Sequence, residues 1–216
     1  MSIFRIGVLA SGGGTNLQTI IDHQKAGKLT VEIALVISNN PTAGALQRAQ
    51  AAGIKTLCIN HRDYNSREDF DRALVSALKD NDVNLVVLAG FMRIITDVML
   101  NAFVHRIINI HPALLPAFPG INVQQQAIDY GARFSGCTVH FVDGGVDTGP
   151  IIIQAVVPIL PQDTASSLSE RILEQEHRIY PQAIQWIAEG RVSIEGRKVM
   201  IADSADCEST LINPIS

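Results

Sequence analysis

The N-terminal region contains the stretch that decides the fold, Ile3-Phe4-Arg5-Ile6-Gly7-Val8-Leu9-Ala10-Ser11-Gly12-Gly13-Gly14-Thr15-Asn16. Its first eight residues are mostly apolar, with β-branched side chains among them, which is typical of a strand. Three consecutive glycines then form a turn, and apolar residues recur at helical spacing from Leu17 to Lys25. A strand that passes through a short glycine turn into a helix is the opening unit of an α/β fold.

The same alternation continues through the first half of the chain. We expect strands at residues 3–10, 31–38, 54–59, 84–89 and 106–110, with helices at 17–25, 43–52, 66–79 and 96–103. Repeated strand-helix-strand units need crossover connections, which place the strands parallel to one another. Val86-Val87-Leu88 is uniformly apolar, as in a strand that is covered on both faces. The sequence therefore predicts a Rossmann-like, doubly wound and mostly parallel sheet.

The pattern changes after Pro119-Gly120. We expect a helix at 124–130, antiparallel neighbouring strands at 134–142 and 151–157, a long C-terminal helix at 165–188, and a hairpin of strands 193–195 and 198–201. Ser167 and Glu170 have the spacing of a capping box at the start of the long helix. Pro181 should kink or break that helix at Tyr180, because proline has no N–H to donate.

Composition and charge are those of a soluble globular protein. The chain of 216 residues is 47% hydrophobic, enough for one core, and we expect a single α/β domain over 1–202 and a loose tail over 203–216. With a formal net charge of -4 the surface offers no basic track, so we expect small-molecule partners and no nucleic acid. The three cysteines lie far apart, and no apolar run approaches about 20 residues. We therefore expect a cytoplasmic protein without a membrane partner, and the sequence leaves a homodimer open.

The glycine turn, residues 11–16, opens a helix. Backbone N–H groups and the helix dipole favour an anion at such a position, and phosphate is the natural ligand. Thr15 and Asn16 add polar side chains. The turn lacks the G-x-G-x-x-G spacing of dinucleotide-binding proteins and the Gly-Lys-Ser/Thr ending of a P-loop, which argues against a nicotinamide cofactor and against triphosphate hydrolysis. The alternative interpretation is a tight turn that only caps the helix.

Asn109, His111 and Asp147 form the candidate catalytic set. Residues two apart in an extended segment project from one face, so Asn109 and His111 can address the same substrate carbonyl. An imidazole titrates near neutral pH, and an amide N–H can stabilise the oxyanion of a tetrahedral intermediate. Asp147 lies in a glycine-rich loop, and its carboxylate would favour and orient the imidazolium. Ligands of α/β sheets bind at the carboxyl ends of strands, which favours this interpretation over a histidine that only caps a strand.

Other groups carry weaker signals. We considered a zinc site made of His105, His111, His140 and Asp147. Their spacing matches no compact ligand signature and Arg106 would repel a cation, so we expect no metal. The segment 91–95 follows a buried strand and should line a cleft in part, although its Phe and Met residues are also typical of core. By default, Arg67 and Glu176 would be solvated helix residues.

Taken together, these motifs are those of a known family, and the chain resembles the phosphoribosylglycinamide formyltransferases, folate-dependent enzymes of purine biosynthesis. The resemblance runs from about Ile3 to Val192 and rests on the glycine turn through Asn16-Leu17, Leu88-Ala89-Gly90-Phe91-Met92-Arg93, Asn109-Ile110-His111-Pro112 and the Asp147 loop. It implies transfer of a formyl group from 10-formyltetrahydrofolate, a co-substrate, to the amino group of 5'-phosphoribosylglycinamide, without a metal. The tail after Arg197 matches no motif of that family.

The resemblance also implies roles for individual residues. The catalytic residues would be Asn109, His111 and Asp147. The phosphoribosyl substrate would be held by Gly14, Thr15, Asn16 and Leu17, with Glu176 on its ribose side. The formyl folate would contact Arg67, Met92, Arg93, Ile94, Ile95, Asn109 and His140. The glycinamide amine would attack the formyl carbon directly, while the amide and the protonated imidazole stabilise the oxyanion and the carboxylate orients the imidazole or relays a proton through water.

Three alternatives share part of this pattern. A formyltetrahydrofolate hydrolase would use water in place of the amine, and that family usually carries a regulatory domain before the first strand, where this chain begins. A methionyl-tRNA formyltransferase would need a further C-terminal domain and a basic surface. A non-catalytic sensor of phosphate ligands would keep the glycine turn, but it would have no need for Asn109, His111 and Asp147 together.

Overall fold

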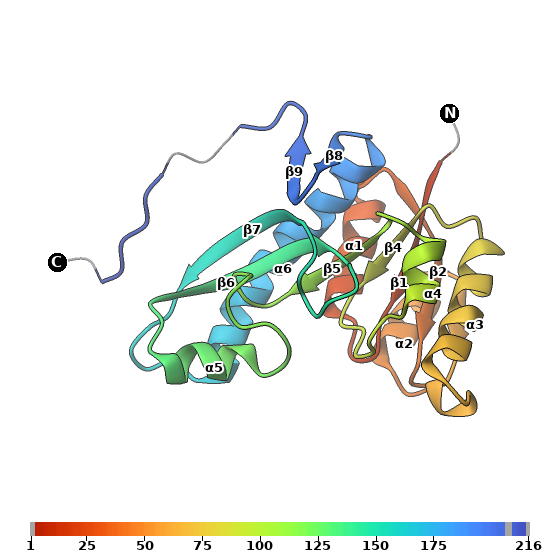
Figure 1. Cartoon of the computed structure of the whole chain (residues 1–216), viewed down its shortest axis with the longest axis horizontal. Helices are drawn as coiled ribbons and strands as arrows, with labels where there is room; N and C mark the ends of the chain where they lie inside the picture. The colour runs from red at the N-terminus through yellow and green to blue at the C-terminus, as the bar shows by residue number, and fades with distance from the viewer. Residues whose placement is uncertain (1–2, 206–208, 215–216) are drawn as a thin grey trace.

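Strands and helices alternate through the first half of the chain (Figure 1). The computed structural model describes residues 3–205 and 209–214. In chain order the first elements are β1 (Phe4–Leu9), α1 (Thr15–Lys25), β2 (Val31–Ser38), α2 (Gly44–Ala51), β3 (Thr56–Cys58), the 3-10 helix η1 (His61–Asp63), α3 (Arg67–Lys79), β4 (Leu85–Leu88), α4 (Asp97–Ala102) and β5 (Ile107–His111). The predicted strands and helices of this half are confirmed, with small shifts at their ends, and η1 was not predicted.

The second half adds two antiparallel strands to the same sheet. Its elements are α5 (Val123–Tyr130), β6 (Phe134–Phe141), β7 (Ile151–Pro158), α6 (Ala165–Ala188), β8 (Val192–Glu195) and β9 (Lys198–Ile201). The sheet order is β3-β2-β1-β4-β5-β6-β7, with parallel pairing as far as β5 and antiparallel pairing of β6 and β7, while β8 and β9 form a separate hairpin. The chain reverses its direction of winding between β1 and β4. Open α/β sheets bind ligands at such a switch point.

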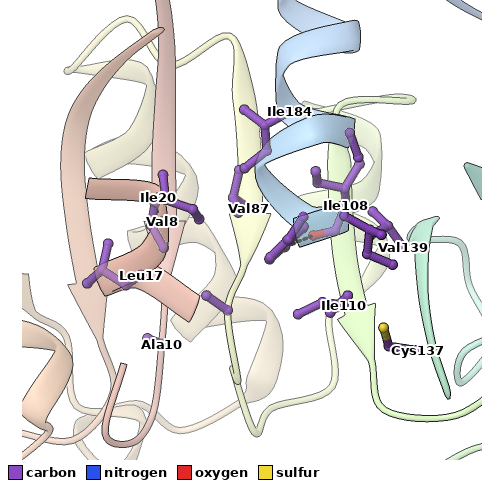
Figure 2. Packing of buried hydrophobic residues seen from close by; sticks show 14 of the residues in the cluster. Val8, Ala10, Leu17, Ile20, Val87, Ile108, Ile110, Cys137, Val139 and Ile184 are labelled. Carbon is purple, nitrogen blue, oxygen red and sulfur yellow. Dashed lines mark hydrogen bonds between the residues drawn. The ribbon is translucent and has the colours of Figure 1, made fainter. Parts of the chain in front are cut away.

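Helices cover both faces of the sheet (Figure 1). Residues of α1, α2, α5 and α6 belong to one buried cluster, and residues of α3 and α4 belong to the other. Within β1, Val8 faces the first cluster and Leu9 the second, because successive side chains of a strand point to opposite faces. Figure 2 shows Val87 of β4 and Ile108 of β5 next to Ile184 of α6. The central strands are therefore buried on both faces, as predicted.

Helix α6 differs from its prediction in two ways. The capping box is made by Thr164 and Ser167, not by Ser167 and Glu170. The predicted break at Tyr180 is wrong, because one helix continues through Pro181 to its end. Both Tyr180 and Pro181 are buried, and the Tyr180 hydroxyl donates to the main-chain carbonyl oxygen of Leu88 at 2.8 Å. Packing against the sheet outweighs the hydrogen bond that a proline inside a helix gives up.

The C-terminal region begins with the predicted hairpin, β8 and β9. Beyond it, residues 203–205 and 209–214 form neither helix nor strand, and the Asn213 side chain donates to the main-chain oxygen of Arg133 at 2.7 Å. Other parts of the predicted tail lie outside the described residues, and its looseness stays a prediction. Among the described residues, no helix has both the length and the apolar character that crossing a bilayer requires.

Candidate active site

The glycine turn lies at the carboxyl end of β1 and packs directly on α2. Gly14 precedes α1 with a φ of 76°, and a Cβ built there would lie 2.7 Å from the Cα of Ala45. The Ala45 amide donates to the Gly12 carbonyl at 3.1 Å. A side chain at Gly14 would therefore push the turn off α2. The turn borders a hollow of about 290 Å³, the glycine-turn hollow, lined by residues 11–16, Ala89, Gly90 and Met92.

Asn16 points from this turn towards α6. Its Nδ2 donates to the Glu176 carboxylate at 2.7 Å, and its Oδ1 is buried without a partner among the described residues. Burial raises the pKa of Glu176, while the hydrogen bond from Asn16 acts in the opposite direction. The default expectation of a solvated Glu176 is wrong, because the side chain is buried. Leu17 is also buried in the core, so that only its amide, which lacks an intrahelical partner, can face a ligand.

The three candidate catalytic residues come from one strand of the sheet and from one loop. Asn109 and His111 are on β5, and Asp147 is in the loop between β6 and β7. The Nδ1 of His111 lies 3.3 Å from Asp147 Oδ2. On β6, His140 is paired with Asn109 across the strands, and its Nε2 lies 3.3 Å from Asn109 Nδ2 and 3.7 Å from Asp147 Oδ1. The fold thus brings together polar side chains from two separate segments of the sequence, 109–111 and 140–147.

Asp147 is held in an unusual backbone conformation. Its φ is 54°, a left-handed value that is uncommon for residues other than glycine, although aspartate tolerates it better than most. The Gly120 amide donates to its Oδ2 at 2.9 Å. Burial by itself would raise the pKa of Asp147, but the contacts with His140, the Gly120 amide and His111 together lower this pKa below its ordinary value. The carboxylate is therefore ionised at neutral pH.

Both ring nitrogens of His111 face acceptors. The Nε2 lies 2.9 Å from the main-chain oxygen of Phe118, and the Nδ1 faces Asp147. A doubly protonated ring satisfies both acceptors at once. The His111 side chain is buried, and Asp147, 3.3 Å away, lies between it and the space that Asn109 lines; that Asn109 and His111 address one substrate carbonyl stays a prediction.

A second hollow, the Asp147 hollow, lies beside this cluster and has a volume of about 130 Å³. It is lined by Leu88, Phe91, Arg93, Ile94, Ile95, Asn109, His140, Val142, Asp143, Gly145, Val146, Asp147 and Thr148. Five of the residues expected to contact folate are in this lining: Arg93, Ile94, Ile95, Asn109 and His140. Met92 instead lines the glycine-turn hollow, and Arg67, an exposed residue at the start of α3, lines neither.

Several site residues had no signal in the sequence. The Ser11 hydroxyl donates to Asn39 Oδ1 at 2.6 Å and accepts from the Met92 amide at 2.8 Å, which ties the ends of β1, β2 and β4 together. The Arg48 side chain donates to the Gly13 carbonyl at 2.8 Å from α2. A serine after a strand and an arginine on a helix are too common to be selected by spacing alone. In the described parts of the chain, no three His, Cys, Asp or Glu side chains gather as metal ligands would.

This fold and site define a class of α/β proteins in which a polar cluster and a glycine turn lie at the carboxyl edge of the parallel strands. Within that class the chain belongs to the formyl transferase family, whose sequence model matches residues 4–184.

Individual relatives agree with this membership. The chain is 44% identical over 191 residues to the phosphoribosylglycinamide formyltransferase of Haemophilus influenzae, covering 88% of this chain and 90% of that protein. The crystal structure of glycinamide ribonucleotide transformylase 1 from Symbiobacterium toebii has a TM-score of 0.92 and 53% identity, covering 93% of this chain and 95% of that one. The trifunctional purine biosynthetic protein adenosine-3 of Drosophila melanogaster is 48% identical over 192 residues, which cover 88% of this chain. The chain spans only 14% of the length of that larger relative.

Proposed function

We propose that this chain transfers a formyl group from 10-formyltetrahydrofolate to the amino group of 5'-phosphoribosylglycinamide, a step in the biosynthesis of purines. Membership of the formyl transferase family and the likeness to the Haemophilus influenzae enzyme support the reaction. The observation that carries the proposal is the polar cluster itself, in which the Asp147 carboxylate lies 3.3 Å from His111 at the edge of a hollow that Asn109 lines. Amine attack on an acyl carbonyl needs such groups: a carboxylate and an imidazole for proton transfer, and an amide N–H to stabilise the oxyanion.

We assign the two hollows to the two substrates. The glycine-turn hollow, with the amides at the start of α1, would take the phosphate of phosphoribosylglycinamide. Thr15 and Asn16, which line this hollow, would lie beside the phosphoribosyl group, and Glu176 would hold Asn16 in place. The Asp147 hollow would take the formyl end of the folate, with Ile94 and Ile95 on the apolar ring system. Arg67 and Met92 do not line the Asp147 hollow, so they would contact the part of the folate that extends beyond it.

Catalysis would use three groups of the cluster. The glycinamide amine attacks the formyl carbon, and Asn109 donates an N–H to the oxygen that becomes negative. The Asp147 carboxylate orients His111, and it relays a proton through water from the amine towards the departing folate nitrogen. His111 can donate to the oxyanion only after its Nε2 leaves the carbonyl of Phe118, now 2.9 Å away. Substrate binding would therefore displace the segment around Phe118.

Assays of three variants test this function. His111→Ala and Asp147→Ala should each lower kcat for formyl transfer by about 100-fold or more, because general acid-base catalysis contributes about that much. Affinity for phosphoribosylglycinamide should change little, since the glycine turn is untouched. The control is His105→Asn, which removes an exposed histidine outside both hollows and keeps a side chain that tolerates its φ of 53°. Wild-type turnover in either alanine variant would remove that residue from the mechanism.

The reaction itself is tested by omitting one substrate. Wild-type protein should consume 10-formyltetrahydrofolate only when phosphoribosylglycinamide is present. Consumption in its absence, with formate as product, would make the chain a hydrolase. Binding of phosphoribosylglycinamide without any folate-dependent product would instead identify a phosphate-ligand sensor.

A further inference from the structure

We propose that Arg197 in the turn of the β8–β9 hairpin is a positioning residue for Asp147. Its Nη2 donates to the main-chain oxygen of Thr148 at 2.7 Å, although the two residues are 49 apart in the sequence. Thr148 follows Asp147 directly, so the bond holds the peptide group between Thr148 and Gly149, one residue beyond the residue that carries the carboxylate. The hairpin lies beyond residues 4–184, the part of the chain that the formyl transferase family accounts for. The inference rests on the proposed function.

The loop that carries Asp147, residues 143–149, is shaped largely by its own contacts. The Asp143 carboxylate accepts from the Gly145 amide at 3.1 Å and from the Thr148 hydroxyl at 2.5 Å. These bonds set the curvature of the loop but do not attach it to the rest of the protein. Among the described residues, Arg197 is the only side chain from outside the loop that hydrogen-bonds to its backbone.

The backbone conformation of Asp147 makes such an attachment consequential. Aspartate tolerates a φ of 54° better than most residues do, but the right-handed and extended conformations are still commoner, so contacts that hold the loop favour the left-handed one. The Gly120 amide holds the side chain of Asp147, and Arg197 holds the carbonyl of Thr148, the next residue. A hydrogen bond from a guanidinium is stronger than one between neutral groups. Loss of the Arg197 bond should therefore reduce the fraction of molecules in which Asp147 meets His111.

The hairpin presents Arg197 in a defined place. Glu195 is paired with Lys198, so that Gly196 and Arg197 form a two-residue turn, and the φ of 62° at Gly196 suits this turn. At the other end, the Arg191 side chain donates to the main-chain oxygen of Ala202 at 2.7 Å and closes the hairpin. Val192, Ile194, Val199 and Ile201 pack against the buried cluster that includes α6, so the hairpin is a fixed support for Arg197.

Three substitutions test the proposal. Arg197→Ala should lower kcat by about threefold to tenfold, the range expected for one hydrogen bond at a partly solvated place, with an unchanged KM for phosphoribosylglycinamide. Arg197→Lys should restore most of the turnover, because an ammonium can also donate to the Thr148 carbonyl. Lys198→Ala is the matched control, since it removes the same charge one residue away and leaves the Arg197 bond in place. An equal effect of Arg197→Ala and Lys198→Ala would overturn the proposal.

Two further measurements separate positioning from general weakening. In an Asp147→Asn background, Arg197→Ala should cause no additional loss of kcat, because Arg197 acts only through Asp147; additive losses would count against the inference. Amide hydrogen exchange of residues 144–149 should quicken in Arg197→Ala and not in Lys198→Ala, and unchanged exchange would also refute it. The exchange result does not need turnover, so a chain that lacks formyl transfer but shows faster exchange would refute the proposed function and leave the positioning intact.

Discussion

At the scale of single residues, Asp147 combines burial, backbone strain and three stabilising contacts. Its lowered pKa has a predictable effect on stability. The carboxylate contributes its full stabilisation above the unfolded-state pKa of about 4, and this contribution is lost as the pH falls through the lowered folded-state pKa. The difference in the free energy of unfolding between wild type and Asp147→Asn should therefore be largest near pH 6 and should shrink towards pH 3. Urea unfolding at a series of pH values measures this difference.

Asparagine is a suitable replacement because it keeps the shape of aspartate and tolerates the left-handed backbone. His111 and His140 remain in both proteins, so the comparison isolates the carboxylate charge. A difference that stays constant or widens between pH 6 and pH 3 would show that the contacts of Asp147 do not favour its ionised form.

Single residues also show where sequence reasoning stops. Asn109 and Asp147 could be selected from the sequence because of their types and places. An amide near the end of a strand can stabilise an oxyanion, and a carboxylate in a glycine-rich loop can orient an imidazole. The contact between His111 and the Phe118 carbonyl could not, because any loop residue has a main-chain oxygen and its position depends on the whole fold. Arg197 was assigned to a turn, but it is 49 positions from Thr148 in the sequence, and no local pattern indicates their contact.

At the scale of elements, α6 is attached to the sheet by a hydrogen bond that Tyr180 makes inside the core. Its fully buried hydroxyl donates to the carbonyl of Leu88 on β4 at 2.8 Å and to that of Ile108 on β5 at 3.3 Å. Tyr180→Phe should reduce the free energy of unfolding by about 1–2 kcal/mol, because a buried bond is lost and little volume changes. Tyr130→Phe is the control, since Tyr130 is 82% exposed and its change should stay within about 0.5 kcal/mol. Equal urea midpoints for the two variants would contradict this role of Tyr180.

The same helix explains which predictions of elements fail. Its predicted bounds, 165–188, follow from helical spacing and are confirmed. Its capping box was misassigned because two overlapping candidates, Thr164 with Ser167 and Ser167 with Glu170, have capping spacing. Its continuity through Pro181 depends on burial against strands that are distant in the sequence. Local preference thus identifies an element, whereas tertiary packing decides whether an unfavourable residue ends it.

At the scale of the whole molecule, the order of the elements was predictable because strand and helix periodicities alternate so regularly. Periodicity does not report how far the domain extends beyond its last element, so the boundary at residue 202 stays a prediction. We expect a chain that ends after Asp203 to keep its melting temperature within about 2 °C and its turnover within about twofold. The main-chain oxygens of Ala202 and Asp203, which Arg191 contacts, would remain. This truncation removes peripheral interactions, such as the hydrogen bond from Asn213 to Arg133, and exposed side chains that include Leu211 and Ile212.

A second truncation, after Arg191, is the comparison for the chain that ends after Asp203. It removes the β8–β9 hairpin together with the tail, and it should lower turnover in the same direction as Arg197→Ala, because the bond to the Thr148 carbonyl is lost in both. Thermal unfolding followed by circular dichroism, with a formyl transfer assay on the same samples, separates the two chains. If ending the chain after Asp203 lowered the melting temperature by about 5 °C, a loss of about 2 kcal/mol for a protein of this size, the tail would be part of the domain and the boundary at 202 would be wrong. If both truncations left turnover unchanged, the hairpin would have no part in holding Asp147.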